Sequence, residues 1–321
     1  RHHHVRLHRQ RRSVGCDGTP TVFAFFLLHS LLSDRKTTQA GLDSAAVGTL
    51  SSTGSRAVVA CRGRCGPELL VASGASVECW RKEGEGQWAR ARIARNPRQS
   101  GPLFSLAVNA EGAGEVAVGG GTDRSVTVFS KNGSVIDTLP GHTGWVRALA
   151  FHGGHLFSVG CQFVKVWRCG PQGWDHVGDL QVHGDILGIA IAAGGILVAV
   201  GVAAQVYRWT LPPSALRPKD WLSHAQQSFR QVPSHDSGRV SCIACRGRTF
   251  FTASHDGTLR RWGLRGDDAV VEDSATLPFR VHCMAVHSDG HLACGGGGRG
   301  PRGRGGGGSG GGRGRARRDA G

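Results

Sequence analysis

The chain has 321 residues and a formal net charge of +16, and hydrophobic residues make up 39% of it. This length accommodates one large domain or two ordinary ones, with enough apolar residues for a sizeable core. No stretch approaches the roughly 18–20 apolar residues that a transmembrane helix needs, so the sequence argues against a membrane partner or a membrane-spanning class.

Residues 1–56 form a basic N-terminal segment, in which the first 15 residues carry five Arg and no acidic side chain. Residues 21–32 read TVFAFFLLHSLL, a short apolar run typical of a signal peptide. Together with the Ser/Thr/Ala-rich residues 37–56 it is also typical of an organelle transit segment. The alternatives are a strand or an untranslated region read through. Because the chain begins with Arg1 and its only Met is Met284, we expect a fragment or an over-extended reading frame.

A repeated pattern occupies residues 57–297, in which an apolar residue stands three positions before an aromatic one. The pairs are Val77/Trp80, Val126/Phe129, Val164/Trp167, Val206/Trp209 and Leu259/Trp262. Successive aromatic residues lie 49, 38, 42 and 53 positions apart. Glycine turns such as Gly153-Gly154 and Gly194-Gly195 mark tight hairpins between the aromatic positions. A period of about 40–45 residues with four short strands per unit predicts an all-β propeller of six or seven blades.

The pattern divides the chain into successive blade-sized units. They lie at roughly 57–100, 101–140, 141–182, 183–233 and 234–281, and a sixth begins at 282. The sixth unit reaches its second strand at HLACGG and is followed by the Gly/Arg-rich tail, residues 298–321. We expect this tail to be disordered, because it lacks the apolar residues that a core needs. A closing strand could come from residues 21–32 or 46–56, and without one the propeller is incomplete.

An insertion over residues 212–233 lengthens the fourth unit. Its stretch DWLSHAQQSF predicts a short helix. We expect a surface loop that the fold tolerates, and a protrusion that binds a partner is the alternative.

The unit SHDSGRVSCIACRGRTFFTASHDGTLRRW resembles the WD40 family most closely, and the resemblance covers about 57–297. In that family a His, a Ser or Thr, an Asp and a Trp hydrogen-bond to one another inside a blade. The resemblance places these roles on His235, Ser254 or Thr252, Asp256 and Trp262. A buried indole N–H and a buried carboxylate both need partners, so these residues are expected to be structural.

Other units retain only part of this set, so the chain resembles a divergent member of the family. The unit GHTGWVRALAF has His142 and is followed by Trp167, but Cys161 stands at the Asp position, so its network is expected to be broken. The second unit retains Asp123 and has Phe129 in place of Trp.

Signals for chemistry are missing from the sequence. It contains no Gly-Lys pair for a phosphate loop and no HExxH. Cys242 and Cys245 form a CxxC inside a predicted strand, and Cys61 and Cys65 make a second loose pair, whereas a zinc site needs two pairs on converging turns. We therefore expect a non-enzymatic protein with no metal, no cofactor and no small-molecule substrate.

The resemblance implies that the loops before each first strand and the second turns dock protein partners. Candidate contact residues there are Trp145, Arg147, Arg124, Gln162, Arg239 and His255. Aromatic and Arg side chains dominate interface energetics. The alternatives are that Trp145 serves packing and that these Arg are ordinary surface residues. The expected function is a scaffold, as an adaptor or a subunit of a multiprotein complex.

The tail offers a second hypothesis, an RNA-associated propeller. Its Arg-Gly pairs begin at Arg299, Arg302, Arg304 and Arg313. Such pairs bind RNA by phosphate contacts and guanidinium stacking. However, the tail has no aromatic residue, and 34 Arg against 5 Lys in the whole chain indicate a compositional bias. We expect a cytoplasmic or nuclear protein, with organelle targeting by residues 1–56 as the alternative.

Overall fold

The fold is known from a computed structural model, which describes residues 55–63, 66–83, 87–235, 238–266, 268–286 and 292–297. Within these residues lie five four-stranded antiparallel sheets, one two-stranded sheet and one helix, α3. The predicted targeting segment and the Gly/Arg-rich tail lie outside the described residues.

Each sheet is built from strands that follow one another in the sequence. The first contains β1 (Ser55–Gly63), β2 (Gly66–Ser73), β3 (Ser76–Glu83) and β4 (Gln87–Arg95). The second contains β5 (Leu103–Val108), β6 (Val116–Gly120), β7 (Val126–Phe129) and β8 (Val135–Leu139). The third contains β9 (Ala148–His152), β10 (His155–Gly160), β11 (Phe163–Gly170) and β12 (Gly173–Gln181).

The same order continues in the second half of the chain. The fourth sheet contains β13 (Ile186–Ala192), β14 (Ile196–Gly201), β15 (Gln205–Thr210) and β16 (Arg230–Pro233). The fifth contains β17 (Val240–Arg246), β18 (Thr249–Ser254), β19 (Thr258–Arg265) and β20 (Asp268–Thr276). The sixth contains β21 (Arg280–Val286) and β22 (Leu292–Gly297).

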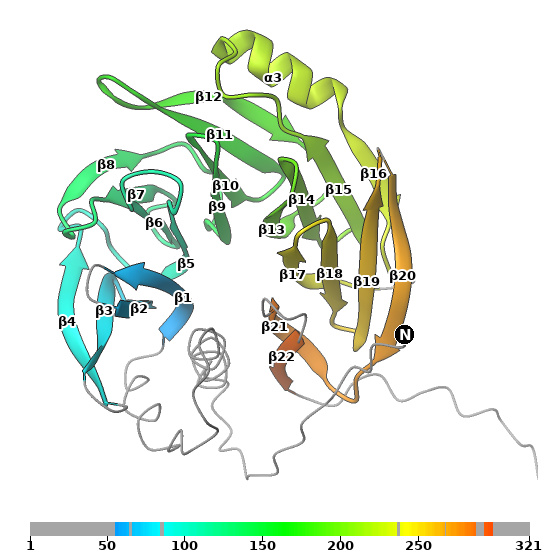
Figure 1. The fold of residues 1–321 in the computed structure, drawn as a ribbon, viewed down its shortest axis with the longest axis horizontal. Helices are drawn as coiled ribbons and strands as arrows, with labels where there is room; N and C mark the ends of the chain where they lie inside the picture. Colours follow the sequence, from blue (N-terminus) through cyan, green and yellow to red (C-terminus); the bar gives the residue numbers. More distant parts are fainter. Residues whose placement is uncertain are drawn as a thin grey trace, which may run out of the picture.

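The sheets stand around a common centre in chain order, each with its first strand innermost (Figure 1). This is the predicted propeller, and the blade-sized units read from the sequence correspond to the sheets. The described part of the sixth blade has two strands. Of residues 46–56, the described Ser55 belongs to β1, which pairs with β2. It therefore lies in the first blade and does not supply the expected closing strand, while residues 21–32 lie outside the described part of the chain.

Hydrophobic cores lie between neighbouring blades, because consecutive sheets pack face to face around the ring. Phe157 and Val166 of the third blade pack with Leu197 and Trp209 of the fourth in one buried cluster. Similar clusters join the other consecutive blades from the first to the sixth. Each blade thus depends mainly on its nearest neighbours, as in other repeat proteins.

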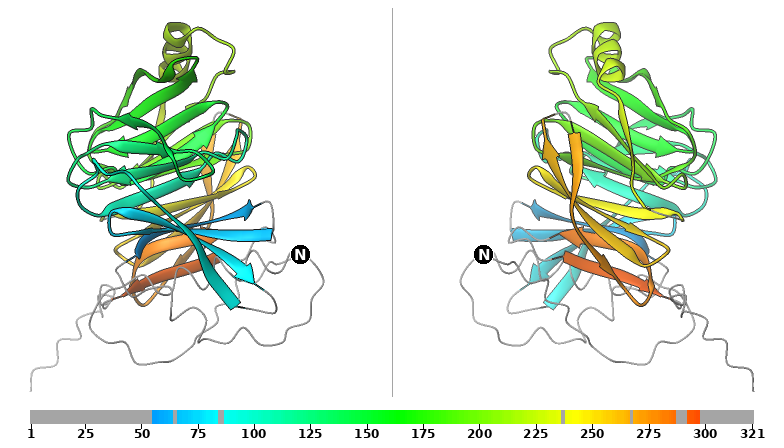
Figure 2. Two further views of the ribbon diagram at one scale, coloured as in Figure 1. Left: turned by 90° about the vertical axis from the view of Figure 1, so that its left-hand side faces the viewer. Right: turned by 90° about the vertical axis from the view of Figure 1, so that its right-hand side faces the viewer.

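The insertion in the fourth unit is shorter than the sequence indicates. The predicted short helix is present as α3 (Pro218–Gln227), which begins with Pro at its first turn. Residues 230–233 form β16, the fourth strand of the blade, and so do not belong to the insertion. The helix lies on the periphery of the ring, outside the third and fourth blades (Figure 1, Figure 2). Its buried residues Trp221 and Ala225 attach it to the core between these blades.

Candidate functional site

A chain of buried hydrogen bonds crosses the fifth blade. The imidazole Nε2 of His235 lies 3.0 Å from the hydroxyl oxygen of Thr252, and the indole N–H of Trp262 donates to that oxygen at 2.9 Å. The other imidazole nitrogen of His235 contacts the Thr258 hydroxyl, which donates to the Asp256 carboxylate at 2.6 Å. These bonds join the segment before β17, the strands β18 and β19 and the turn between them, so the arrangement stabilises the blade.

Two residues of this hydrogen-bond network differ from the set that the sequence indicated. Thr252, and not Ser254, lies between the imidazole and the indole. The hydroxyl of Ser254 instead accepts a bond from the Asp256 backbone N–H at 3.3 Å, at the following turn. Thr258, which links Asp256 to His235, was missed, although a hydroxyl residue two positions after the Asp was a visible signal.

The third blade retains its hydrogen bonds without a carboxylate. Ser158 lies between His142 and Trp167: the imidazole Nε2 is 2.7 Å from its hydroxyl oxygen, and the indole N–H donates to it at 2.7 Å. Cys161 supplies no carboxylate, and its backbone adopts a φ of 59° at the turn. The expectation of a broken network is therefore correct only for its acidic end. Nδ1 of His142 is buried beside Gly160.

The His142 environment predicts a pH-dependent stability. Burial, followed by the nearby charge of Lys165, lowers the pKa of His142 to about 4. In the unfolded chain, His142 binds a proton at an ordinary pKa of about 6.5. The contribution of this residue to the free energy of unfolding is therefore fully present above that pH. It decreases as the pH falls toward 4, by about 3 kcal/mol in total. Urea unfolding at neutral pH and near pH 4.5 measures the decrease, and H142Q should have a smaller one. An equal decrease in both proteins would contradict the assignment.

In the second blade, amide side chains take the place of the His and Trp. The Thr127 hydroxyl donates to Gln99 at 3.1 Å and accepts from the Asn96 amide at 3.0 Å. Asp123, predicted as part of the blade network, accepts from the Ser125 hydroxyl at 2.8 Å, within its own turn. The sequence offered no signal for this arrangement, because Asn96 and Gln99 lie in an ordinary connecting segment.

All six predicted contact residues lie at one end of the ring, the loop face, which comprises the segments before each first strand and the turns between second and third strands. Trp145 and Arg147 precede β9, and Arg239 precedes β17. The other three occupy turns between second and third strands, namely Arg124, Gln162 and His255. Antiparallel pairing brings these connections to the same end of every sheet. Among the described residues, no hydrogen bond or ring contact joins Arg124 or Gln162 to the other four.

Trp145 forms an exposed aromatic stack on the loop face. Its indole is 4.9 Å from the Phe104 ring, with an angle of 11° between the planes, and Trp145 is 49% exposed. The Arg147 guanidinium carbon lies 5.2 Å from the indole centroid. Phe104 belongs to the second blade and Trp145 to the segment entering the third. We refer to Phe104, Trp145 and Arg147 as the aromatic stack.

Backbone contacts between the second and third blades hold the aromatic stack in place. The N–H of Val146 donates to the Gly120 carbonyl at 3.1 Å, and the Ser105 hydroxyl donates to the Val146 carbonyl at 2.9 Å. Gly121 leaves room for the Phe104 ring, since a Cβ there would lie 2.2 Å from it. The stack is thus an exposed feature on a rigid support.

Comparison with known proteins agrees with this geometry. The family model described as "WD domain, G-beta repeat" matches residues 133–168 and 226–263. These segments contain the strands of the third and fifth blades that carry Trp167 and Trp262.

The chain is a divergent WD40-repeat β-propeller.

Its fold resembles that of the WD40 β-propeller domain of Doa1, with a TM-score of 0.59, 19% identity and coverage of 76% of each chain. The propeller also resembles nuclear distribution protein nudF 2 of Penicillium rubens, at 38% identity over 63 residues. It is 40% identical over 62 residues to nuclear distribution protein PAC1-1 of Uncinocarpus reesii. These matches cover 20% and 18% of the propeller chain and only 13% and 14% of the relatives.

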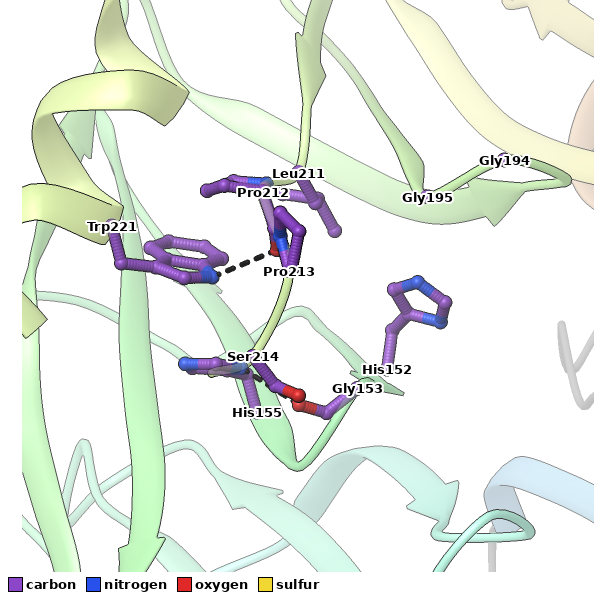
Figure 3. A pocket seen from close by; sticks show the side chains of 10 residues that line it. All are labelled: His152, Gly153, His155, Gly194, Gly195, Leu211, Pro212, Pro213, Ser214 and Trp221. Atoms are coloured by element: carbon purple, nitrogen blue, oxygen red, sulfur yellow. Dashed lines mark hydrogen bonds between the residues drawn. The ribbon is translucent and has the colours of Figure 1, made fainter. Parts of the chain in front are cut away.

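A pocket of about 220 Å³ lies at the opposite end of the WD40 propeller, beside α3 (Figure 3). It is lined by the turns at 152–155 and 194–195, by residues 211–214 and by Trp221. His155 stacks on Trp221 with 4.5 Å between ring centroids and donates from Nδ1 to the Gly153 carbonyl at 3.0 Å. The Trp221 indole donates to the Pro212 carbonyl at 3.1 Å.

The residues that line the pocket attach α3 to the propeller. They include few side chains that could take part in a reaction. Ser214 supplies the only hydroxyl among the lining residues, and no hydrogen bond in the described structure joins it to His152 or His155. The sequence gives no signal for this pocket, because its residues come from three separate connections that show no common motif.

Metal and membrane features are also not found in the described part of the propeller. No three His, Cys, Asp or Glu side chains in the described ranges are grouped as a metal would require. Cys242 and Cys245 lie on β17, and burial raises the pKa of both thiols, that of Cys245 to about 12. No helix among the described residues is long and apolar enough to cross a membrane.

Proposed function

We propose that this WD40 propeller is a non-enzymatic scaffold that docks protein partners on its loop face, as an adaptor or a subunit of a larger assembly. The observation that carries the proposal is the aromatic stack. Trp and Arg are among the residue types that contribute most to binding at protein interfaces. Because Phe104 and backbone bonds already hold the Trp145 ring, binding costs little additional conformational entropy.

The family supports the same function. WD40 propellers generally act as interaction scaffolds, and the propeller resembles nuclear distribution proteins. Since the matches cover only a small part of those relatives, their whole-protein roles are not carried over. The RNA hypothesis for the tail stays a prediction, because Arg299, Arg302, Arg304 and Arg313 lie outside the described residues.

Affinity capture of the full chain from cell extract, with and without RNase, tests the proposal. We expect a set of captured proteins that resists RNase and decreases at least about ten-fold for the W145A/R147E variant. The matched control is I136A/R265E, which alters an equally exposed apolar residue and an exposed Arg away from the loop face. Equal retention by both variants would remove the aromatic stack as the docking site. Capture that collapses with RNase would favour RNA instead.

A further inference from the structure

A second feature of the loop face is a group of four basic side chains where the fifth and sixth blades meet. This basic cluster consists of Arg239, His255, Arg280 and His282. The rings of His255 and His282 lie edge to face, with 5.2 Å between centroids. The backbone N–H of His255 donates to the Arg239 carbonyl at 3.0 Å, and Arg280 begins the strand that carries His282.

The basic cluster is held on a fixed backbone. The Ser241 hydroxyl of β17 contacts the carbonyl of Val281, the residue between Arg280 and His282, at 2.5 Å. The N–H of Leu277 donates to the Gly257 carbonyl at 2.8 Å. A Cβ at Gly257 would lie 2.5 Å from the Leu277 carbonyl oxygen, so the segment entering β21 packs directly on the turn that carries His255. Contacts within the propeller therefore position the basic groups before any partner binds.

The positive charge of the cluster is not balanced within the described structure. Neither Arg239 nor Arg280 forms an ion pair with a described carboxylate. Asp256, the nearby acid, accepts bonds from the backbone N–H and the hydroxyl of Thr258 through one oxygen. The pKa of His255 is lowered first by burial and then by the charges of His282, Arg239 and Arg280. Like charges held together in this way favour an anionic partner.

We propose that the basic cluster binds an acidic, Asp- or Glu-rich segment of the protein that docks on the loop face, an inference that rests on the proposed scaffold function. Two guanidinium groups match carboxylates, because each can donate two parallel hydrogen bonds. Arg280 and His282 are exposed, and Arg239 and His255 are half-buried, so the cluster is accessible from solvent. A carboxylate at this position also offsets the positive charge that Arg239 and Arg280 exert at this site.

Acidic protein is a better match for this site than nucleic acid. Single-stranded RNA is bound largely by stacking bases on exposed aromatic faces next to basic groups. The cluster contains no Trp or Tyr, and the neighbouring Phe279 is packed against the core between the fifth and sixth blades. The aromatic stack belongs to the second and third blades, and is therefore separated from the cluster by the fourth.

The test is fluorescence anisotropy of a labelled oligo-glutamate peptide with the full chain, compared with oligo-glutamine and oligouridylate. We expect oligo-glutamate to bind, with an affinity that decreases as salt increases, and R239Q/R280Q to weaken it at least about ten-fold. The matched control R95Q/R98Q removes the same charge from exposed arginines near the first and second blades, and should weaken it less than about two-fold.

Several results would overturn the inference. These are absence of oligo-glutamate binding, equal losses in both variants, or oligouridylate binding as strongly and through the same arginines. The scaffold proposal fails separately, because it depends on capture through Trp145 and Arg147. If oligo-glutamate does not bind while that capture is retained, only the acidic segment is excluded. Circular dichroism of each variant confirms that the propeller is folded.

Discussion

The W262A variant is expected to lose about 3–5 kcal/mol of unfolding free energy. Trp262 is 1% exposed and stacks on Phe250, with 5.5 Å between centroids and an angle of 5°. Truncation leaves a cavity in the core between the fourth and fifth blades. It also removes the donor to the Thr252 hydroxyl, which is buried in the same blade.

Urea unfolding followed by circular dichroism measures this loss. W262F retains an aromatic ring but loses the indole N–H and part of the ring volume, so we expect a smaller destabilisation, of about 1–2 kcal/mol. The matched control is W145A, which truncates the same residue type at a position that is 49% exposed, and should cost less than about 1 kcal/mol. If W145A and W262A were equally destabilising, the division between a structural and a surface Trp would be wrong.

The W221A variant is expected to release α3 from the propeller. Trp221 is 1% exposed and is held by the His155 ring and by its hydrogen bond to Pro212. An isolated helix of this length is marginally stable in water, so α3 depends on this anchor. We therefore expect amide hydrogens of residues 218–227 to lose most of their protection from exchange, and unfolding free energy to fall by about 3–5 kcal/mol.

Hydrogen exchange resolved by segment measures the release. W221F preserves a ring against His155 and should retain most of the protection, whereas L222A, which shortens a half-buried neighbour, should change it only slightly. Protection of α3 that is unchanged in W221A would show that other contacts hold the helix. Loss of protection throughout the ring would show that α3 is required for the whole fold.

The local pattern of the sequence was sufficient to predict the propeller. Aromatic residues such as Trp167 and Trp262 recur at the third strand of a blade, and glycine turns such as Gly153-Gly154 mark the hairpins. Strand alternation and hairpin turns depend on residues that are close in sequence, so the period remains visible although most blades have lost part of the family pattern. The same reasoning located the loop face, because antiparallel strands bring alternate connections to one end.

Contacts between distant segments were decided only by the tertiary structure. The choice of Thr252 over Ser254 depends on which hydroxyl faces the indole. The stack of Trp145 on Phe104 and the pairing of His255 with His282 each join two blades. Such contacts are set by the angle and distance between neighbouring sheets, which result from how the inter-blade cores pack. A repeat period carries no information about those quantities. For this reason the sequence determined the blades, while packing between the blades determined the arrangement of the proposed binding surfaces.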